Sequence, residues 1–107
     1  MLLLFSVTLT TGQIFKTSLK ITVRDELGNT VDSASVKLFE RKEDYTKEVN
    51  VAFEGLTDAK GVVKFKDLKP ISYFIIVRKK DKNNYGGGEE VGVLEKGKFN
   101  KTTVIIQ

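Results

Sequence analysis

The chain has 107 residues, of which 40% are hydrophobic, and its 18 Lys and Arg residues against 14 Asp and Glu give a formal net charge of +4. This length and hydrophobic content fit one domain with a modest core. The chain contains no Cys and no His, which excludes disulfide bonds, Ser-His-Asp and Cys-His nucleophiles, and the usual zinc ligands. The basic residues are spread through every segment, so the net charge favours no particular anionic partner.

The first residues are an apolar stretch, 1–9, followed by three small residues, 10–12. This arrangement is typical of the end of a secretory signal peptide. Apolar and polar residues also alternate within the stretch, so an ordinary strand is the alternative. The stretch is too short to span a bilayer, and no Cys follows it to carry a lipid anchor. We predict that residues 1–12 are a signal-peptide remnant and that residues 13–107 form a single β-sandwich domain.

A period of two dominates the chain after residue 18, with apolar residues alternating with polar ones. Turn residues such as Gly, Asn and Asp separate these alternating segments. The predicted strands are 19–24, 34–38, 49–54, 62–65, 73–77, 90–95 and 102–106. Seven short strands with turn signals between them favour an all-β fold, a seven-stranded Greek-key β-sandwich of immunoglobulin-like type.

The charged segment 40–47 is the nearest competitor for a helix. Its residues tolerate helix, but it has no apolar stripe at helical spacing that a helix would need in order to bury one face. We therefore predict a solvated loop or hairpin tip here.

Two turns bracket the fourth predicted strand. Asp58 is placed to bond its own backbone two residues on, and Gly61 supplies the positive φ that a tight reversal requires. Pro70 fixes the corner after the strand. Tyr73 is placed to bury its ring while its hydroxyl reaches a backbone partner at that corner. We assign these four residues structural turn and corner roles.

These residues carry a family resemblance. Their order resembles that of the carboxypeptidase-regulatory-like group of transthyretin-like (prealbumin-like) β-sandwiches. The residues that carry the resemblance are Leu19 to Val23, Gly28, Ala34 to Leu38, Thr57-Asp58 with Gly61, Phe65, Leu68 with Pro70 and Tyr73, and the closing Thr103 to Ile106. The resemblance spans about residues 19–107 and implies a two-sheet sandwich, but it says little about function. The family usually has Gly after the Pro, where this chain has Ile71 and Ser72. Asn84-Tyr85 stands where the family commonly has glycine-tyrosine. Related hydrolases that act on a urate derivative imply catalytic histidines, which this chain lacks.

A neighbouring family bears on covalent crosslinking. Bacterial surface sandwiches of the collagen-adhesin B type share the aspartate-glycine turn and the tyrosine corner, and many of them join a first-strand Lys to a last-strand Asn with the help of a buried Glu. Lys20 stands at the amine position. Residues 76–78 occupy the place of the assisting Glu, and the predicted closing strand contains no Asn. We therefore predict no isopeptide bond.

The remaining chemical candidates favour no reaction. Glu89 and Glu90 are adjacent, and adjacent side chains on a strand point to opposite faces, so they are not expected to flank one glycosidic bond. The glycines 86–88 lack a following Lys-Ser/Thr and precede acids, which favours a hairpin tip over a phosphate-binding loop. The aspartates in turns lack the closely spaced oxygen ligands of a calcium loop. We predict no enzyme activity, no catalytic residue, no cofactor and no metal site.

We expect a non-catalytic exported structural or interaction module of the cell envelope or exterior, whether secreted, periplasmic or on the cell surface. Its partner is expected to be a protein or cell-surface component, contacted through Tyr45 in the charged loop and Tyr85 beside the glycines, since tyrosine is favoured at recognition surfaces. Local packing of these two tyrosines is the alternative. A second hypothesis is a small-ligand or carbohydrate-binding sandwich that uses the same rings. A third is weak nucleic-acid binding through the basic run 78–82.

Overall fold

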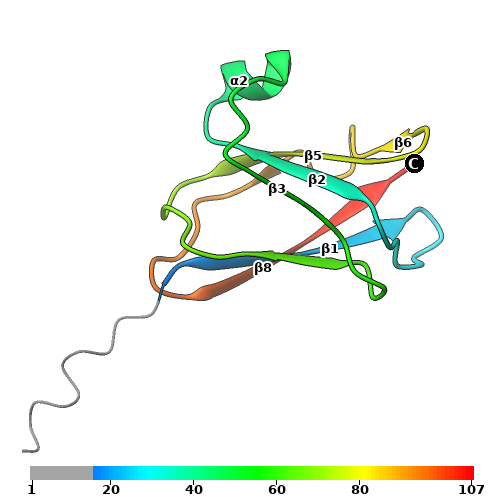
Figure 1. The fold of residues 1–107 in the computed structure, drawn as a ribbon, viewed down its shortest axis with the longest axis horizontal. Coiled ribbons are helices and arrows are strands. Elements are labelled where there is room, and N and C mark those ends of the chain that lie inside the picture. Colours follow the sequence, from blue (N-terminus) through cyan, green and yellow to red (C-terminus); the bar gives the residue numbers. More distant parts are fainter. Residues whose placement is uncertain (1–15) are drawn as a thin grey trace, which may run out of the picture.

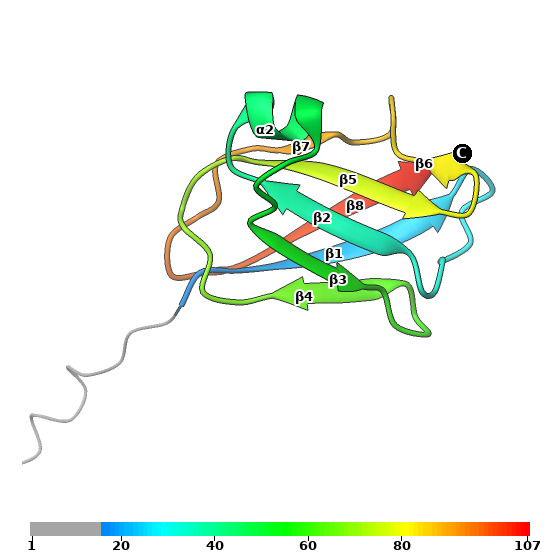
Figure 2. The ribbon, with the colours of Figure 1, turned by 45° about the horizontal axis from the view of Figure 1, so that its top comes forward.

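The computed structural model describes residues 16–107, so the predicted signal remnant at 1–12 lies outside the described residues. Two sheets face each other (Figures 1 and 2). The three-stranded sheet has the order β4-β1-β8 and consists of β1 (Ser18–Asp25), β4 (Val62–Phe65) and β8 (Phe99–Ile106). The five-stranded sheet has the order β3-β2-β5-β6, with β7 also on β5, and consists of β2 (Ser35–Phe39), β3 (Phe53–Leu56), β5 (Tyr73–Lys79), β6 (Lys82–Asn83) and β7 (Glu90–Val91).

The predicted all-β sandwich is confirmed, but the predicted count of seven strands is wrong, because the described residues contain eight. The extra strand is β6, which pairs with the last two residues of β5. Lys80 adopts a φ of 57°, in the left-handed region, and this reverses the chain directly after β5. The sequence has no glycine at this point, so the usual signal for such a reversal is missing.

Several predicted strand limits are also wrong. The third strand, predicted at 49–54, starts only at Phe53, because Glu48 and Asn50 have φ values of 55° and 53° that no extended strand accommodates. The sixth, predicted at 90–95, keeps only its first two residues. The last, predicted at 102–106, begins three residues earlier, at Phe99. Its added residues pair with the start of β1.

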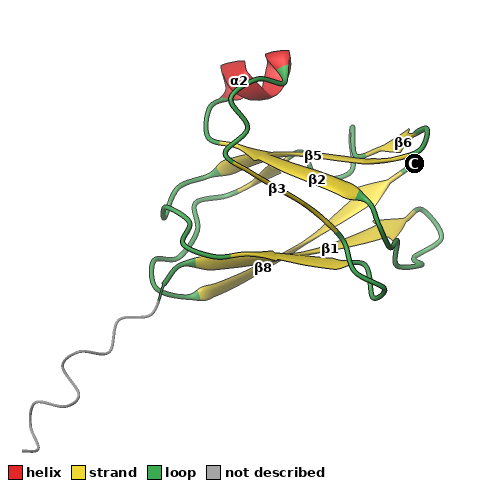
Figure 3. Ribbon diagram, in the orientation of Figure 1, coloured by secondary structure: helices red, strands yellow, loops and turns green. Residues whose placement is uncertain are grey.

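The prediction of a loop over 40–47 is wrong, because a short helix, α2 (Lys42–Lys47), forms there (Figure 3). No apolar stripe supports it. A single ring does so instead, since Tyr45 packs its ring against Phe39 at 6.1 Å and Phe74 at 5.5 Å between centroids. Glu48 then closes the helix in the left-handed conformation, with its N–H directed to the carbonyls of Asp44 and Tyr45.

The core lies between the sheets and comes from alternate residues of the paired strands. On β1 the side chains of Leu19, Ile21 and Val23 are fully buried, whereas the polar residues between them are partly exposed. The five-stranded sheet faces them with buried side chains of β2 and β5, namely Val36, Leu38, Tyr73, Ile75 and Val77. Each such side chain contributes about 1.5–3 kcal/mol by leaving water, so these residues supply the main driving force for the sandwich.

The first and last strands of the sandwich are neighbours and run parallel. Their register joins Ser18 to Phe99 at one end and Asp25 to Ile106 at the other, over the full length of both strands. The described chain therefore enters β1 at one end of the sandwich and leaves β8 at the opposite end (Figure 1).

Because β8 begins at Phe99, it includes Asn100, and the prediction that the closing strand contains no Asn is wrong. Asn100 pairs with Leu19, whereas Lys20 pairs with Lys101. Adjacent positions on a strand face opposite sides of the sheet, so the amine of Lys20 and the amide of Asn100 project from opposite faces. The amide nitrogen of Asn100 donates to the carbonyl of Ser18 at 3.1 Å. In residues 16–107, no helix has the length and apolar content needed to cross a membrane.

Candidate partner-contact surface

Tyr45 and Tyr85, the two predicted contact residues, belong to elements that meet beside the five-stranded sheet. Tyr45 projects from α2 and is half-buried, because its ring fills the space between Phe39 and Phe74. Tyr85 follows β6 and is 54% exposed. Its backbone N–H donates to the side-chain oxygen of Asn83 at 3.0 Å. Tyr45 therefore attaches the helix to the sheet, and Tyr85 is the ring that faces solvent.

Glu89 connects the two elements. Its carboxylate accepts a hydrogen bond from the hydroxyl of Tyr45 at 2.6 Å and another from the backbone N–H of Gly86 at 2.8 Å. Burial, followed by the hydrogen bond to Glu89, raises the pKa of Tyr45. The same two hydrogen bonds, with that from Tyr45 the larger cause, lower the pKa of Glu89. At neutral pH the phenol is thus a fixed donor to a carboxylate, and this bond joins α2 to the loop that carries Tyr85.

A second carboxylate, that of Glu48, holds the C-terminal end of α2 against the sheet. Arg78 donates to both of its oxygens, at 2.6 and 2.8 Å, and Lys37 adds a third contact at 3.1 Å. These hydrogen bonds, with that of Arg78 the largest cause, lower the pKa of Glu48 to about 2. The three residues are far apart in the sequence, and no spacing rule pairs them, so this cluster could not be found from the sequence.

The basic run 78–82, predicted as a weak nucleic-acid contact, does not present one uniform basic surface. Arg78 is engaged by Glu48, and Lys82 lies 3.5 Å from a carboxylate oxygen of Glu26. Lys79 and Lys82 are half-buried, whereas Lys80 is exposed. The run therefore divides between ion pairs and a turn.

The turn before β4 is built from one aspartate and one glycine. The carboxylate of Asp58 accepts the backbone N–H groups of Lys60 at 2.8 Å and Val62 at 3.0 Å, and these bonds lower its pKa, with Val62 the larger cause. Gly61 has a φ of +76°, and a Cβ on it would come within 2.8 Å of the Cβ of Thr30. Both conformation and space therefore require glycine here.

The corner before β5 uses the phenol of Tyr73. Its hydroxyl accepts the backbone N–H of Lys69 at 3.0 Å, while its ring is fully buried and packs edge-on against Phe53. Burial is the largest cause of a raised pKa for this phenol. Pro70 lies exposed at the outside of the corner. Tyr73 thus closes the corner and fills the core with one side chain.

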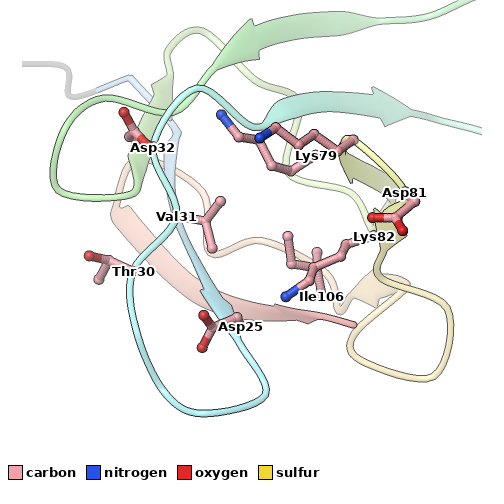
Figure 4. Close-up of a pocket in the computed structure, with 9 residues that line it drawn as sticks. Asp25, Thr30, Val31, Asp32, Lys79, Asp81, Lys82 and Ile106 are labelled. Carbon is pink, nitrogen blue, oxygen red and sulfur yellow. The ribbon is translucent and has the colours of Figure 1, made fainter.

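A surface pocket opens at the end of the sandwich where the loop after β1 meets the reversal between β5 and β6 (Figure 4). It is lined by Asp25, Thr30, Val31, Asp32, Lys79, Lys80, Asp81, Lys82 and Ile106. Its aspartates and lysines balance in charge. One oxygen of the Asp25 carboxylate, Oδ1, accepts the N–H groups of Leu27 and Asn29. The pocket gathers no uniform charge for an ionic ligand.

The carboxylates considered for catalysis have separate partners. Glu89 is held by Tyr45 and Gly86, whereas Glu90 accepts the hydroxyl of Ser72 at 2.9 Å. Within residues 16–107 no three Asp or Glu side chains come together in a way that would hold a metal ion.

Comparison with known proteins finds a similar fold in solved structures but no relative by sequence. No protein family matches the chain in a family scan, and no curated protein matches it by sequence. Among solved structures it is similar to the Bacillus anthracis TIE protein, with a TM-score of 0.60 and 21% identity over 86% of this chain and 17% of that one. It is also similar to BcpA, the major pilin subunit of Bacillus cereus, with a TM-score of 0.60 and 18% identity over 87% of this chain and 30% of that one. At these identities the likeness establishes the fold. The chain spans well under half of either protein.

Proposed function

We propose that the chain is a non-catalytic, exported structural module of the cell envelope or exterior, of carboxypeptidase-regulatory-like type, that carries tension along its long axis. The turn at Asp58 and Gly61 and the corner at Tyr73 support the family type. The likeness to a domain-sized part of a pilin subunit supports a structural role. The observation that carries the proposal is the parallel pairing of β1 with β8.

This pairing determines how a pulling force is distributed. The chain enters at Ser18 and leaves after Ile106, at opposite ends of two parallel, fully paired strands. A force that separates these ends slides one strand past the other, so every hydrogen bond of the ladder is loaded at once. A force applied to both strands at the same end opens the ladder one pair at a time. Forced unfolding follows the height of the unfolding barrier, and the first geometry makes that barrier high.

Single-molecule pulling tests the structural role. The chain has no Cys, so cysteine handles can be introduced in pairs. Lys16→Cys with Gln107→Cys loads β1 and β8 along their length, and Lys16→Cys with Lys98→Cys peels them apart from one end. We expect the first pair to unfold at a several-fold higher force. Equal forces in the two geometries would remove the argument for a tension-carrying module.

Export is tested separately, in the native host. Mature protein that begins near Gln13 and is found in the periplasm, the envelope fraction or the medium supports the exported assignment. An intact chain that begins at Met1 in the cytosol contradicts it.

Tyr85 is proposed as the partner contact, and Tyr45 helps to position its loop through the hydrogen bond to Glu89. A Tyr85→Ala variant is expected to keep its melting temperature, because the ring is mostly in water, but to lose retention in the envelope fraction. Val93→Ala is the control, since Val93 is 73% exposed in a different loop. Equal retention of both variants would exclude Tyr85 as the contact.

A further inference from the structure

The outer face of the three-stranded sheet brings together lysines that are far apart in the sequence. Lys64 on β4 and Lys101 on β8 are both paired with Lys20 on the central strand. Paired residues project from the same face, and neighbouring strands are about 4.8 Å apart, so three ammonium groups form one row across the sheet. Lys64 and Lys101 are exposed, and Lys20 is half-buried.

An aromatic ring lies next to this row. Phe99 is paired with Ser18, one step along the same face, and it is 53% exposed. The ammonium groups of Lys64 and Lys101, from opposite edges of the sheet, lie 5.8 and 5.9 Å from the centre of its ring. Two shallow pockets adjoin the ring, and their lining adds three further lysines, Lys16, Lys66 and Lys98. We call this set of six lysines with Phe99 and Ser18 the lysine face.

The lysine face has few counter-charges, and the linings of its two pockets include one acid, Asp67. Among residues 16–107, only Lys16 of the six has an acidic partner, Asp67 at 3.2 Å, and this pair is largely exposed. Residues 1–15 contain no Asp or Glu. Outside the lysine face, six of the other twelve Lys and Arg residues have an acidic partner, as Arg78 has Glu48 and Lys69 has Glu40. Five of the six lysines of the lysine face therefore have no acidic partner among residues 16–107, and this face carries a local excess of positive charge.

This arrangement costs stability in the free protein. Like charges directly opposite each other on neighbouring strands repel. An anionic ligand laid across the row removes the repulsion and releases its own counterions, so its binding is favoured by both effects. The exposed ring of Phe99 between ammonium groups adds an apolar surface on which a sugar ring can pack.

We propose that the lysine face binds an anionic polysaccharide, with repeating acidic groups on the lysines and one sugar ring on Phe99. The inference rests on the export in the proposed function, because such polymers lie outside the cell. A nucleic acid fits less well. Proteins that bind single strands offer successive aromatic platforms and arginine planes, whereas the lysine face has one ring and no arginine.

The test is equilibrium binding of a fluorescein-labelled oligogalacturonate, which has one carboxylate on each sugar, to the purified protein at about 50 mM salt. We expect binding that weakens steeply as salt is added. The fully methyl-esterified oligosaccharide keeps the sugars and lacks the charges, and its affinity is expected to be at least about tenfold lower, since it has no counterions to release.

Matched triple variants locate the site. The first variant carries Lys20→Gln, Lys64→Gln and Lys101→Gln, and its affinity for the oligogalacturonate is expected to be at least about tenfold lower. The slope of log affinity against log salt is expected to fall by about 2, which is about 0.7 for each ammonium group removed. The control variant carries Lys42→Gln, Lys60→Gln and Lys80→Gln, three exposed lysines elsewhere. Its net charge equals that of the first triple variant, and its affinity is expected to change by less than about twofold, because none of the three lysines belongs to the lysine face.

A Phe99→Ala variant separates sugar packing from charge. It is expected to lose several-fold in affinity for the oligogalacturonate with an unchanged salt slope. Three results would overturn the proposal: no binding of the oligogalacturonate at low salt, an equal loss in the two triple variants, or tighter binding of a thymidine oligonucleotide of equal charge. The binding assay uses purified protein. Its outcome therefore does not depend on where the protein is found in the cell or on the force at which it unfolds, and the two proposals can fail separately.

Discussion

The side-chain oxygen of Asn84 accepts a hydrogen bond from the backbone N–H of Val77 at 2.9 Å. The nitrogen of the same amide donates to the carbonyls of Ile75 at 2.9 Å and Gly88 at 3.0 Å. Asn84 is only 2% exposed. Between the residues of β5 that pair with β7 and those that pair with β6, this one amide therefore satisfies the carbonyl of Ile75 and the N–H of Val77 in place of a paired strand.

Replacing Asn84 should be among the most damaging single changes in the chain. An Asn84→Ala variant leaves the N–H of Val77 and the carbonyl of Ile75 buried without partners, so we expect the free energy of unfolding to fall by about 2–4 kcal/mol, measured by urea denaturation. Asn83→Ala is the control. It removes one exposed hydrogen bond, to the N–H of Tyr85, and should cost about 1 kcal/mol or less. Similar losses for the two variants would contradict this role of Asn84.

Gly87 is required for space. A Cβ at this position would overlap the carbonyl oxygen of Ile105, whose own N–H donates to the carbonyl of Gly87 at 2.9 Å. In a Gly87→Ala variant the backbone must move away from β8 and lose that hydrogen bond. We therefore expect the free energy of unfolding to fall by about 2–4 kcal/mol. Gly92→Ala is the matched control, because its Cβ would meet nothing within 4 Å. Gly92→Ala should change the free energy of unfolding by no more than about 0.5 kcal/mol. Thermal melts of both variants and the wild type measure the difference.

The ion pair of Glu48 with Arg78 predicts a pH dependence of stability. The pKa of Glu48 falls from its ordinary value of 4.5 to about 2 in the folded chain. The contribution of this ion pair to the free energy of unfolding is therefore complete above about pH 4.5 and is lost as the pH falls toward about 2. Glu48→Gln should destabilise the protein at neutral pH by about 0.5–1 kcal/mol, because the pair is partly screened by water.

The measurement is urea unfolding of the wild type and the Glu48→Gln variant from pH 7 to pH 2. We expect the two curves to converge as the pH falls through this window. Glu43→Gln is the control, because it removes only ion pairs that are exposed on the surface of α2. Its free energy of unfolding should match that of the wild type at every pH. A difference between wild type and Glu48→Gln that persists at the lowest pH would show that the charge of Glu48 is not the cause.

The row of lysines predicts a conflict between stability and binding. Lys101→Glu places an acid opposite Lys20, so the repulsion becomes an attraction, and the free energy of unfolding should rise by about 0.2–1 kcal/mol at low salt. High salt should remove the gain. The same variant should lose affinity for oligogalacturonate. Lys96→Glu, which changes the net charge equally outside the strands, should not be stabilised. A fall in the stability of Lys101→Glu at low salt would mean that the row is not repulsive.

Local pattern was sufficient to predict the sandwich. The alternation of Leu19, Ile21 and Val23 with polar residues gives one buried face, and a sheet with one buried face needs a second layer against it. The other apolar segments alternate in the same way and none has a helical stripe, so that layer is a second sheet. Strand ends were predicted less well, because they depend on the left-handed conformations of Glu48, Asn50 and Lys80, which are not glycines.

The helix and the lysine face could not be predicted, since both depend on long-range contacts. α2 is held by the packing of Tyr45 on Phe74 and by the ion pair of Glu48 with Arg78, which the spacing of charges does not reveal. The lysine face arises because β1 has β4 on one side and β8 on the other. In the sequence its residues look like ordinary solvated positions of separate strands.

The place of β8 beside β1 also determines when the protein can fold. β8 is the longest partner of β1, the central strand of the smaller sheet, and all the other strands are synthesised between the two. Contacts so distant in sequence close slowly, since the intervening chain must first be ordered. Until β8 has left the ribosome, the nascent sandwich has one sheet unfinished. A nascent chain that lacks β8 should therefore remain open to proteases, even though all the other strands have been made.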